Sequence, residues 1–255
     1  MSDARERLLE AERRLFLHYE LDVDTRFVQL ADPKLRVRIV EAGAGESLVL
    51  IHGSGMLGSS WAPLMAHLRD WRVIAPDLPG FGLSDPHDYA GRELPRHAVA
   101  QLESLLDALE LPRARLVGTS LGGMWALCLA LEHPERVSGI VSLGVPAAAL
   151  PGMHGDPFFT AVSTPVIGAL AVRIKPPTTK LARRGMVKVL GQEAVDRTPD
   201  EWFDVVRLAM RMPGHSRANA QPHAARHAPR TPATRELRER QRAERHPDTG
   251  SPPVG

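Results

Sequence analysis

The sequence predicts an α/β protein built on a doubly wound, mostly parallel sheet. Between residues 26 and 146, short apolar segments typical of strands alternate with longer segments of helical periodicity. Residues 48–51 form a continuous apolar run, which indicates a central parallel strand covered on both faces. The repeated order of strand, helix and strand requires right-handed crossovers, so helices are expected on both faces of the sheet.

Length and composition fit this fold class. A chain of 255 residues suits one α/β domain with an inserted subdomain, and 43% hydrophobic and 24% charged residues are ordinary for a globular protein. The net charge of +2 combines +3 over residues 221–255 with −1 over the rest. The folded part therefore does not indicate a nucleic-acid partner, and the Arg residues of the C-terminal part are mixed with Glu, which disfavours a membrane or nucleic-acid anchor there.

The single cysteine, Cys128, excludes an internal disulfide, and its place in an apolar segment predicts a packing role. Residues 1–20 are rich in Arg and Glu and contain no apolar core of a signal peptide. No window approaches ~18 uninterrupted apolar residues, so no membrane span is expected. We expect a cytoplasmic protein without a metal or an organic cofactor, and the sequence leaves its oligomeric state open.

The first elements precede the central strand. Residues 1–25 are expected to form an N-terminal helical segment, because leucines and a phenylalanine recur among charges over residues 4–20. Strands are predicted at 26–30 and 35–40, and the strict alternation of Arg36–Val40 predicts a half-exposed strand.

The other core elements lie in a domain expected to span residues 26–150. The pattern predicts helices at 59–68, 96–109 and 123–131, and strands at 71–77, 113–117 and 137–143.

The segment Gly118-Thr119-Ser120-Leu121-Gly122 stands where a predicted strand turns into an apolar helix. In this context the G-x-S-x-G pattern indicates a strained turn that exposes the serine hydroxyl at the carboxyl end of the sheet. The adjacent helix N-terminus offers N–H groups and a dipole that stabilise an oxyanion. For the five residues alone, a glycine-rich turn whose serine caps the helix is the alternative.

Four motifs follow one another in order: His52-Gly53-Ser54-Gly55, Asp77 to Asp85, Gly118 to Gly123, and His133 to Val137. Together they resemble the α/β-hydrolase fold family, in its large branch of esterases, epoxide and C–C bond hydrolases, peptidases and lactonases. The resemblance covers about residues 26–146. The loop at 52–55 is similar to the oxyanion loop of the C–C bond hydrolases, but four residues are too few to choose a substrate.

The resemblance implies a nucleophile and an oxyanion hole. Ser120 would be the nucleophile, and the N–H groups of Leu121 and Ser54 would bind the oxyanion. His52, Gly53 and Gly55 would support the loop, with His52 not acting as the base. A serine at this position disfavours the relatives that use an aspartate nucleophile. Asp77 and Asp85 are expected to order loops, and His133 to be a polar group at a helix end.

Residues 151–215 have a helical pattern, and the resemblance implies a lid inserted after the strand that ends near residue 143. The apolar segment 158–174 and the apolar residues of a helix over 202–210 would line a substrate pocket or only pack the lid onto the core. Thr198–Glu201 predicts a capping box that starts a helix, with Pro199 at the first helical position.

Residues 216–255 are expected to be a disordered tail, since residues 221–255 contain six prolines, seven arginines and two large aliphatic residues. The fold still needs at least two strands, to carry the acid and the histidine of a triad in the order Ser, acid, His. We hypothesise a chain that is changed in frame, or truncated and extended by an unrelated tail. His154 and His215 lie near the ends of the lid and could approach Ser120, and Asp156 could be the acid, but the expected place of each is a solvent-exposed loop. No base is assigned.

Two functions remain open. The first is a serine hydrolase that acts on a carboxylic ester or a related small-molecule acyl substrate through Ser120 and a backbone oxyanion hole. The alternative is a catalytically incomplete hydrolase fragment or pseudoenzyme that lacks a functional base.

Overall fold

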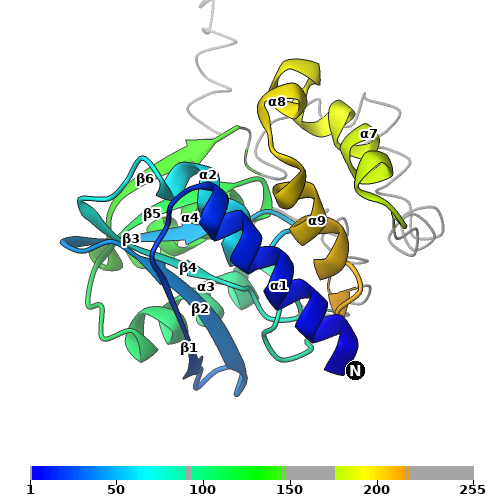
Figure 1. The fold of residues 1–255 in the computed structure, drawn as a ribbon. Coiled ribbons are helices and arrows are strands. Elements are labelled where there is room, and N and C mark those ends of the chain that lie inside the picture. Colours follow the sequence, from blue (N-terminus) through cyan, green and yellow to red (C-terminus); the bar gives the residue numbers. More distant parts are fainter. Residues whose placement is uncertain (1, 90–92, 145, 147–175, 216–217, 219–255) are drawn as a thin grey trace, which may run out of the picture. The chain divides into compact units, whose positions relative to one another are not determined.

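A computed structural model describes residues 2–89, 93–144, 146, 176–215 and 218 (Figure 1). The chain divides into two units, Met1–Ala225 and Arg226–Gly255, and all described residues belong to the first. The predicted apolar lid segment 158–174, His154, Asp156 and nearly all of the predicted tail at 216–255 lie outside the described residues. Ala218 is described and is buried, and its N–H donates to the Gly214 carbonyl at 2.9 Å.

The described strands form one six-stranded sheet in the order β1-β2-β4-β3-β5-β6. β2 pairs antiparallel with both β1 and β4, and the neighbours β4-β3, β3-β5 and β5-β6 are parallel. The prediction of a mostly parallel α/β sheet is confirmed. The strands are β1 (Val23–Gln29), β2 (Arg36–Ala42), β3 (Glu46–Ile51), β4 (Trp71–Pro76), β5 (Ala114–Thr119) and β6 (Val137–Leu143).

The helices lie close to their predicted places. The segment predicted as one helix at 59–68 begins instead with a 3₁₀ turn and continues as a helix of four residues. The helical elements are α1 (Ser2–His18), η1 (Gly58–Trp61), α2 (Ala62–Met65), α3 (Leu94–Ala108), α4 (Leu121–Glu132), η2 (Pro134–Arg136), α7 (Thr179–Leu190), α8 (Gln192–Arg197) and α9 (Asp200–Ala209).

The buried apolar side chains fall into clusters. One joins the sheet to α3 and α4 and contains Val49, Ile51 and Trp125. A second joins α1 to α9 and includes Leu57, which precedes η1. The indole of Trp202 on α9 also donates to the Ser60 carbonyl at 2.9 Å. The apolar face of α9 therefore packs against α1 and the segment around η1, as the packing alternative for the lid expects.

β2 differs from its prediction. The alternation of Arg36–Val40 predicted a half-exposed strand, but every residue from Val37 to Val40 is buried. Val37 and Ile39 belong to the cluster with α3 and α4, while the guanidinium of Arg38 pairs with Glu12 on α1. The alternating sequence correctly predicts that β2 has an apolar and a polar face. Both faces are nevertheless buried, because Glu12 of α1 pairs with Arg38 on the polar face.

The predicted capping box before α9 is also wrong. The Thr198 hydroxyl donates backwards, to the Ala194 carbonyl of α8 at 2.7 Å. The N-cap of α9 is Pro199, and no side chain caps the helix there. The acidic residues of the first turn, Asp200 and Glu201, still favour this helix end through the helix dipole.

β6 is the edge strand of the described sheet, and Val141 and Leu143 on it are 53% and 40% exposed. Cys128 is buried on α4, where burial, assisted by Glu132, raises the pKa of its thiol to about 11. Within the described ranges, no helix is long and apolar enough to cross a membrane, and no cluster of His, Cys, Asp and Glu is arranged to hold a metal ion.

Candidate active site

Ser120 occupies a strained turn between β5 and α4. Its backbone dihedrals are φ 49° and ψ −112°, a conformation that non-glycine residues rarely adopt. Such strain persists only where the surrounding structure imposes it, and it is common at functional sites. The serine is exposed, and no side chain caps the N-terminus of α4. The helix-capping alternative for this serine is therefore wrong.

The glycines on either side of Ser120 are required by close backbone contacts. A Cβ on Gly118 would lie 2.6 Å from the Gly122 carbonyl carbon, and a Cβ on Gly122 would lie 2.1 Å from the Ile51 carbonyl oxygen. Real Cβ atoms do not approach backbone atoms so closely. The two glycines let α4 start directly against the ends of β5 and β3, which fixes the turn that carries Ser120.

The end of β3 brings a second segment to the serine, residues 52–59, called the 52–59 loop from here on. A Cβ on Gly53 would lie 3.3 Å from Ser120 Cβ and 3.4 Å from the Thr119 carbonyl oxygen. Residues 53–56 form a tight turn, in which the Met56 N–H donates to the Gly53 carbonyl at 3.2 Å and Gly55 has φ 80°. A positive φ at the third turn residue is typical of a type II turn and favours glycine.

The predicted oxyanion donors lie on the two segments that meet at Ser120. Leu121 is the first residue of α4, so its N–H has no partner within the helix. Ser54 follows Gly53 and is half-buried. The structure thus brings both residues to the neighbourhood of the serine, and their role as donors remains a prediction.

His52 is a neutral, fully buried side chain that holds the 52–59 loop. Its Nε2 accepts the Leu78 N–H at 2.9 Å, which leaves the proton on Nδ1 to be donated to the Gly53 carbonyl at 2.7 Å. Burial lowers the pKa of His52 to about 4. Both ring nitrogens are engaged, so this side chain supports the loop and is not poised to act as a base.

The two aspartates predicted to order loops make such contacts. Asp77 is fully buried, and its carboxylate accepts the N–H groups of Gly58 and Leu83 at 2.7 and 2.8 Å. Asp85 accepts the Arg36 N–H at 2.8 Å. His133 ends α4 and contacts the carboxylates of two glutamates, Glu103 at 3.3 Å and Glu135 at 3.2 Å, as expected of a helix-terminal polar group.

His215 is the clearest error among the sequence-predicted positions. It was expected in an exposed loop, but it is 1% exposed and its ring packs edge-on against Phe81, with centroids 5.8 Å apart. His52 packs on the same phenylalanine at 5.4 Å. In the part of the chain that the structure describes, no histidine forms a hydrogen bond with the Ser120 hydroxyl.

Sequence reasoning missed two charged residues near this site, Glu12 and Arg38. Both are buried, and they form an ion pair with each other. Arg38 stands between Val37 and Ile39 in a strand that also contains Arg36 and Glu41. A charged residue between two apolar ones could have indicated a buried ion pair, but the same pattern is also typical of a side chain exposed to water.

The strand order, the glycine-flanked serine turn and the adjoining loop after β3 define a class of protein. Residues 46–161 match the family described as alpha/beta hydrolase fold, and the chain belongs to the α/β-hydrolase family. Over 130 residues the chain is 43% identical to 2-hydroxymuconate semialdehyde hydrolase from Pseudomonas sp. (strain CF600). The aligned residues make up 48% of this chain and 44% of that protein.

Two further comparisons extend over more of the chain. A 2-hydroxy-6-oxononadienedioate/2-hydroxy-6-oxononatrienedioate hydrolase from Paraburkholderia phymatum is 35% identical over 173 residues, covering 66% of this chain and 57% of that protein. The chain therefore spans about half the length of these curated relatives. The crystal structure of carboxylesterase CesB from Bacillus subtilis superposes with a TM-score of 0.64 at 22% identity, over 84% of this chain and 70% of that one, which shows a shared fold.

Proposed function

We propose that this protein is a hydrolase that attacks an acyl or oxo carbon with the hydroxyl of Ser120. The observation that carries the proposal is the strained backbone of Ser120, φ 49° and ψ −112°, next to Gly53 of the 52–59 loop. A strained, exposed serine between a strand end and a helix N-terminus is a poor choice for packing or capping, because it gains neither burial nor a capping bond. It is well placed for nucleophilic attack.

The chemistry would proceed in two stages. Ser120 Oγ bonds to the carbonyl carbon while the carbonyl electrons move onto oxygen, where the N–H groups of Leu121 and Ser54 donate to the oxyanion. The oxyanion then collapses, the bond to the leaving group breaks, and the leaving group takes up the proton that Ser120 lost. Water attacks the acyl-enzyme, releases the carboxylic acid and returns a proton to Ser120.

The relatives indicate the substrate class. The names of both curated relatives describe hydrolases of 2-hydroxy compounds that carry an aldehyde or 6-oxo group. Such a compound has no ester bond, so its hydrolysis by one water breaks the carbon–carbon bond beside the oxo carbon. The oxo carbon leaves as a carboxylic acid and the departing carbon gains a proton. We infer that an oxo-dienoate or a carboxylic ester would occupy the site.

A second candidate function is favoured by one observation. No histidine in the described part of the chain is hydrogen-bonded to Ser120, and a serine hydroxyl is a weak nucleophile until a base takes its proton. A catalytically incomplete hydrolase that keeps the turn and the 52–59 loop is therefore the alternative. An oxyanion hole with substrate binding alone leaves roughly 10³-fold catalysis over water.

Labelling with a fluorophosphonate probe separates the two functions. Purified, monodisperse protein is incubated with the probe, and Ser120→Ala is the control. Labelling that is lost in Ser120→Ala supports an activated serine, and turnover is then compared between 2-hydroxymuconate semialdehyde and p-nitrophenyl acetate. Folded wild-type protein that does not label contradicts the serine-hydrolase proposal and favours the incomplete hydrolase.

A further inference from the structure

Three charged side chains are buried together next to the 52–59 loop: Glu12 of α1, Arg38 of β2 and Asp77, which follows β4. Each is at most 2% exposed. Arg38 donates through both terminal nitrogens to Glu12, at 2.8 and 2.9 Å, and its Nη1 lies 3.6 Å from Asp77 Oδ2. Burial alone would lower the pKa of Arg38, but the two carboxylates raise it above its ordinary value. The guanidinium therefore stays charged.

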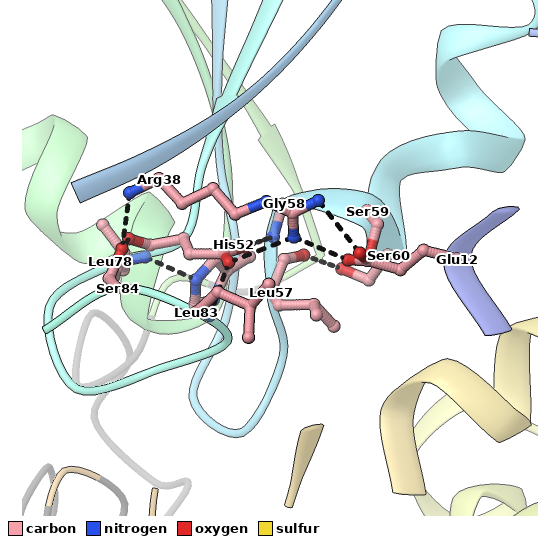
Figure 2. Close-up of polar contacts among 11 residues, drawn as sticks. Glu12, Arg38, His52, Leu57, Gly58, Ser59, Ser60, Leu78, Leu83 and Ser84 are labelled. Atoms are coloured by element: carbon pink, nitrogen blue, oxygen red, sulfur yellow. Dashed lines mark hydrogen bonds and ion pairs between the residues drawn. The ribbon is translucent and has the colours of Figure 1, made fainter. Parts of the chain in front are cut away.

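Both carboxylates also hold the end of the 52–59 loop, and Figure 2 shows Glu12 beside Ser59. The Ser59 hydroxyl donates to Glu12 Oε1 at 2.7 Å, and the Gly58 N–H donates to Asp77 Oδ1 at 2.7 Å. The start of the loop is held by His52, through its bonds to Leu78 and Gly53. Ser54, the proposed oxyanion donor, lies between these two anchored ends.

Burying Glu12, Arg38 and Asp77 removes their hydration, and this loss indicates a role for the three residues other than stability. Burying an ion pair loses hydration that the mutual attraction often does no more than offset, and apolar residues of similar volume serve stability equally well. What the pair adds is direction, because a guanidinium bound by two parallel hydrogen bonds has a defined orientation. An oxyanion donor needs such placement, since it must stand about 2.7–3.1 Å from the developing charge.

We propose that Glu12, acting through Arg38 and Ser59, is a positioning residue that sets the place of the Ser54 N–H relative to Ser120. This inference rests on the proposed function. It makes the N-terminal helix a part of the site, although α1 lies outside the 46–161 segment that matches the family. The contact is a matter of position and not of catalysis, because the carboxylate of Glu12 is occupied by Arg38 and Ser59.

Two variants with matched controls test the role. Glu12→Gln removes the buried charge, and its control is Glu10→Gln, which breaks an exposed pair with Arg13 on the same helix. Ser59→Ala cuts the link to the loop but keeps the pair of Glu12 and Arg38. Its control is Ser104→Ala, which removes a buried hydroxyl that accepts the N–H groups of Ala31 and Asp32.

The rate of fluorophosphonate labelling and the kcat and KM for p-nitrophenyl acetate are measured for all four variants. Glu12→Gln and Ser59→Ala should lower the labelling rate and kcat about 10-fold, with KM changed less than about twofold, because a misplaced donor weakens transition-state binding more than substrate binding. Both controls should stay within about twofold of wild type. Wild-type rates in folded Glu12→Gln and Ser59→Ala would overturn the positioning role, and Ser59→Ala decides alone if Glu12→Gln does not fold.

The failure of the proposed function gives a different result, namely a folded wild-type protein without labelling. Amide hydrogen exchange then decides the positioning role. The Met56 N–H, bonded to the Gly53 carbonyl at 3.2 Å, should exchange about 10-fold faster in Glu12→Gln and Ser59→Ala than in the two controls. Equal exchange in all four variants would reject the inference.

Discussion

The turn at residues 118–123 and the 52–59 loop meet at Ser120, yet they are held in different ways. The turn is shaped by its own residues, since Gly118 and Gly122 remove Cβ atoms that would collide with neighbouring backbone. The loop is held by residues distant in sequence: Leu78 bonds to its His52, Asp77 to its Gly58 and Glu12 to its Ser59. One half of the site therefore depends on local sterics, whereas the other depends on a network of buried polar groups.

This difference determines how each half should respond to change. A steric requirement fails abruptly when an atom is added, and its failure disturbs packing of the whole sheet. A hydrogen-bonded network changes with protonation or with the loss of one partner, and it can alter activity while the fold persists. Three measurements test whether the two halves respond in these different ways.

The largest loss of stability is expected for Gly122→Ala, in the turn at residues 118–123. Its Cβ would stand 2.1 Å from the Ile51 carbonyl oxygen, so α4 would have to move away from β3. We expect a loss of at least about 3 kcal/mol in the free energy of unfolding, measured by urea denaturation.

The control for Gly122→Ala is Gly185→Ala on α7, where an added Cβ meets nothing within 4 Å. That control should gain about 0.5–1 kcal/mol from helix propensity. A Gly122→Ala protein as stable as wild type would show that the turn is not sterically determined.

Acid should lower the stability of the folded protein by protonating His52, which belongs to the hydrogen-bonded network of the 52–59 loop. The folded state lowers the pKa of this histidine to about 4, while the unfolded chain keeps its ordinary value of 6.5. As the pH falls, the unfolded state therefore binds a proton before the folded state does. The free energy of unfolding keeps its full value above about pH 6.5 and decreases between about pH 6.5 and 4. The total decrease is about 3 kcal/mol.

Urea denaturation of wild type and His52→Gln at pH 7, 5.5 and 4.5 measures this effect. The side chain of His52→Gln does not titrate, so the variant should show a smaller fall in stability over the same range. Parallel pH dependence in the two proteins would mean that His52 is not held neutral by the fold.

The smallest effect on stability is expected where the two halves touch. A Cβ on Gly53 would lie 3.3 Å from Ser120 Cβ, a contact that a shift of a few tenths of an ångström relieves. Gly53→Ala should cost about 1 kcal/mol in the free energy of unfolding and should lower fluorophosphonate labelling more strongly than stability.

Gly139→Ala on β6 is the matched control for Gly53→Ala, since its Cβ meets nothing within 4 Å. If Gly53→Ala labels as fast as Gly139→Ala, then the spacing between the loop and the serine does not matter for attack.

The same contrast explains what the sequence could predict. The turn was predictable because Gly118, Ser120 and Gly122 are contiguous, and the strand and helix around it have strong apolar patterns. The positions of the strands were predictable for a similar reason, since short apolar runs mark strands wherever they are buried.

The network was not predictable, because its partners are distant in sequence. Glu12 and Arg38 are 26 positions apart, and a charged residue on a helix face or in an alternating strand normally indicates solvent. His215 fails in the same way: nothing near it in the sequence shows that Phe81 packs on its ring. Burial of a polar side chain is decided by what covers it, and the covering element is specified elsewhere in the chain.

The buried cysteine has a practical consequence for spectroscopy on this protein. Cys128 is the only cysteine of the chain, and it is 8% exposed with a thiol pKa of about 11, so it carries almost no reactive thiolate at neutral pH. A cysteine introduced at an exposed position, for example Glu6→Cys on α1, would then take up a maleimide dye alone. Site-specific fluorescence could follow the start of α1 without first removing the native thiol.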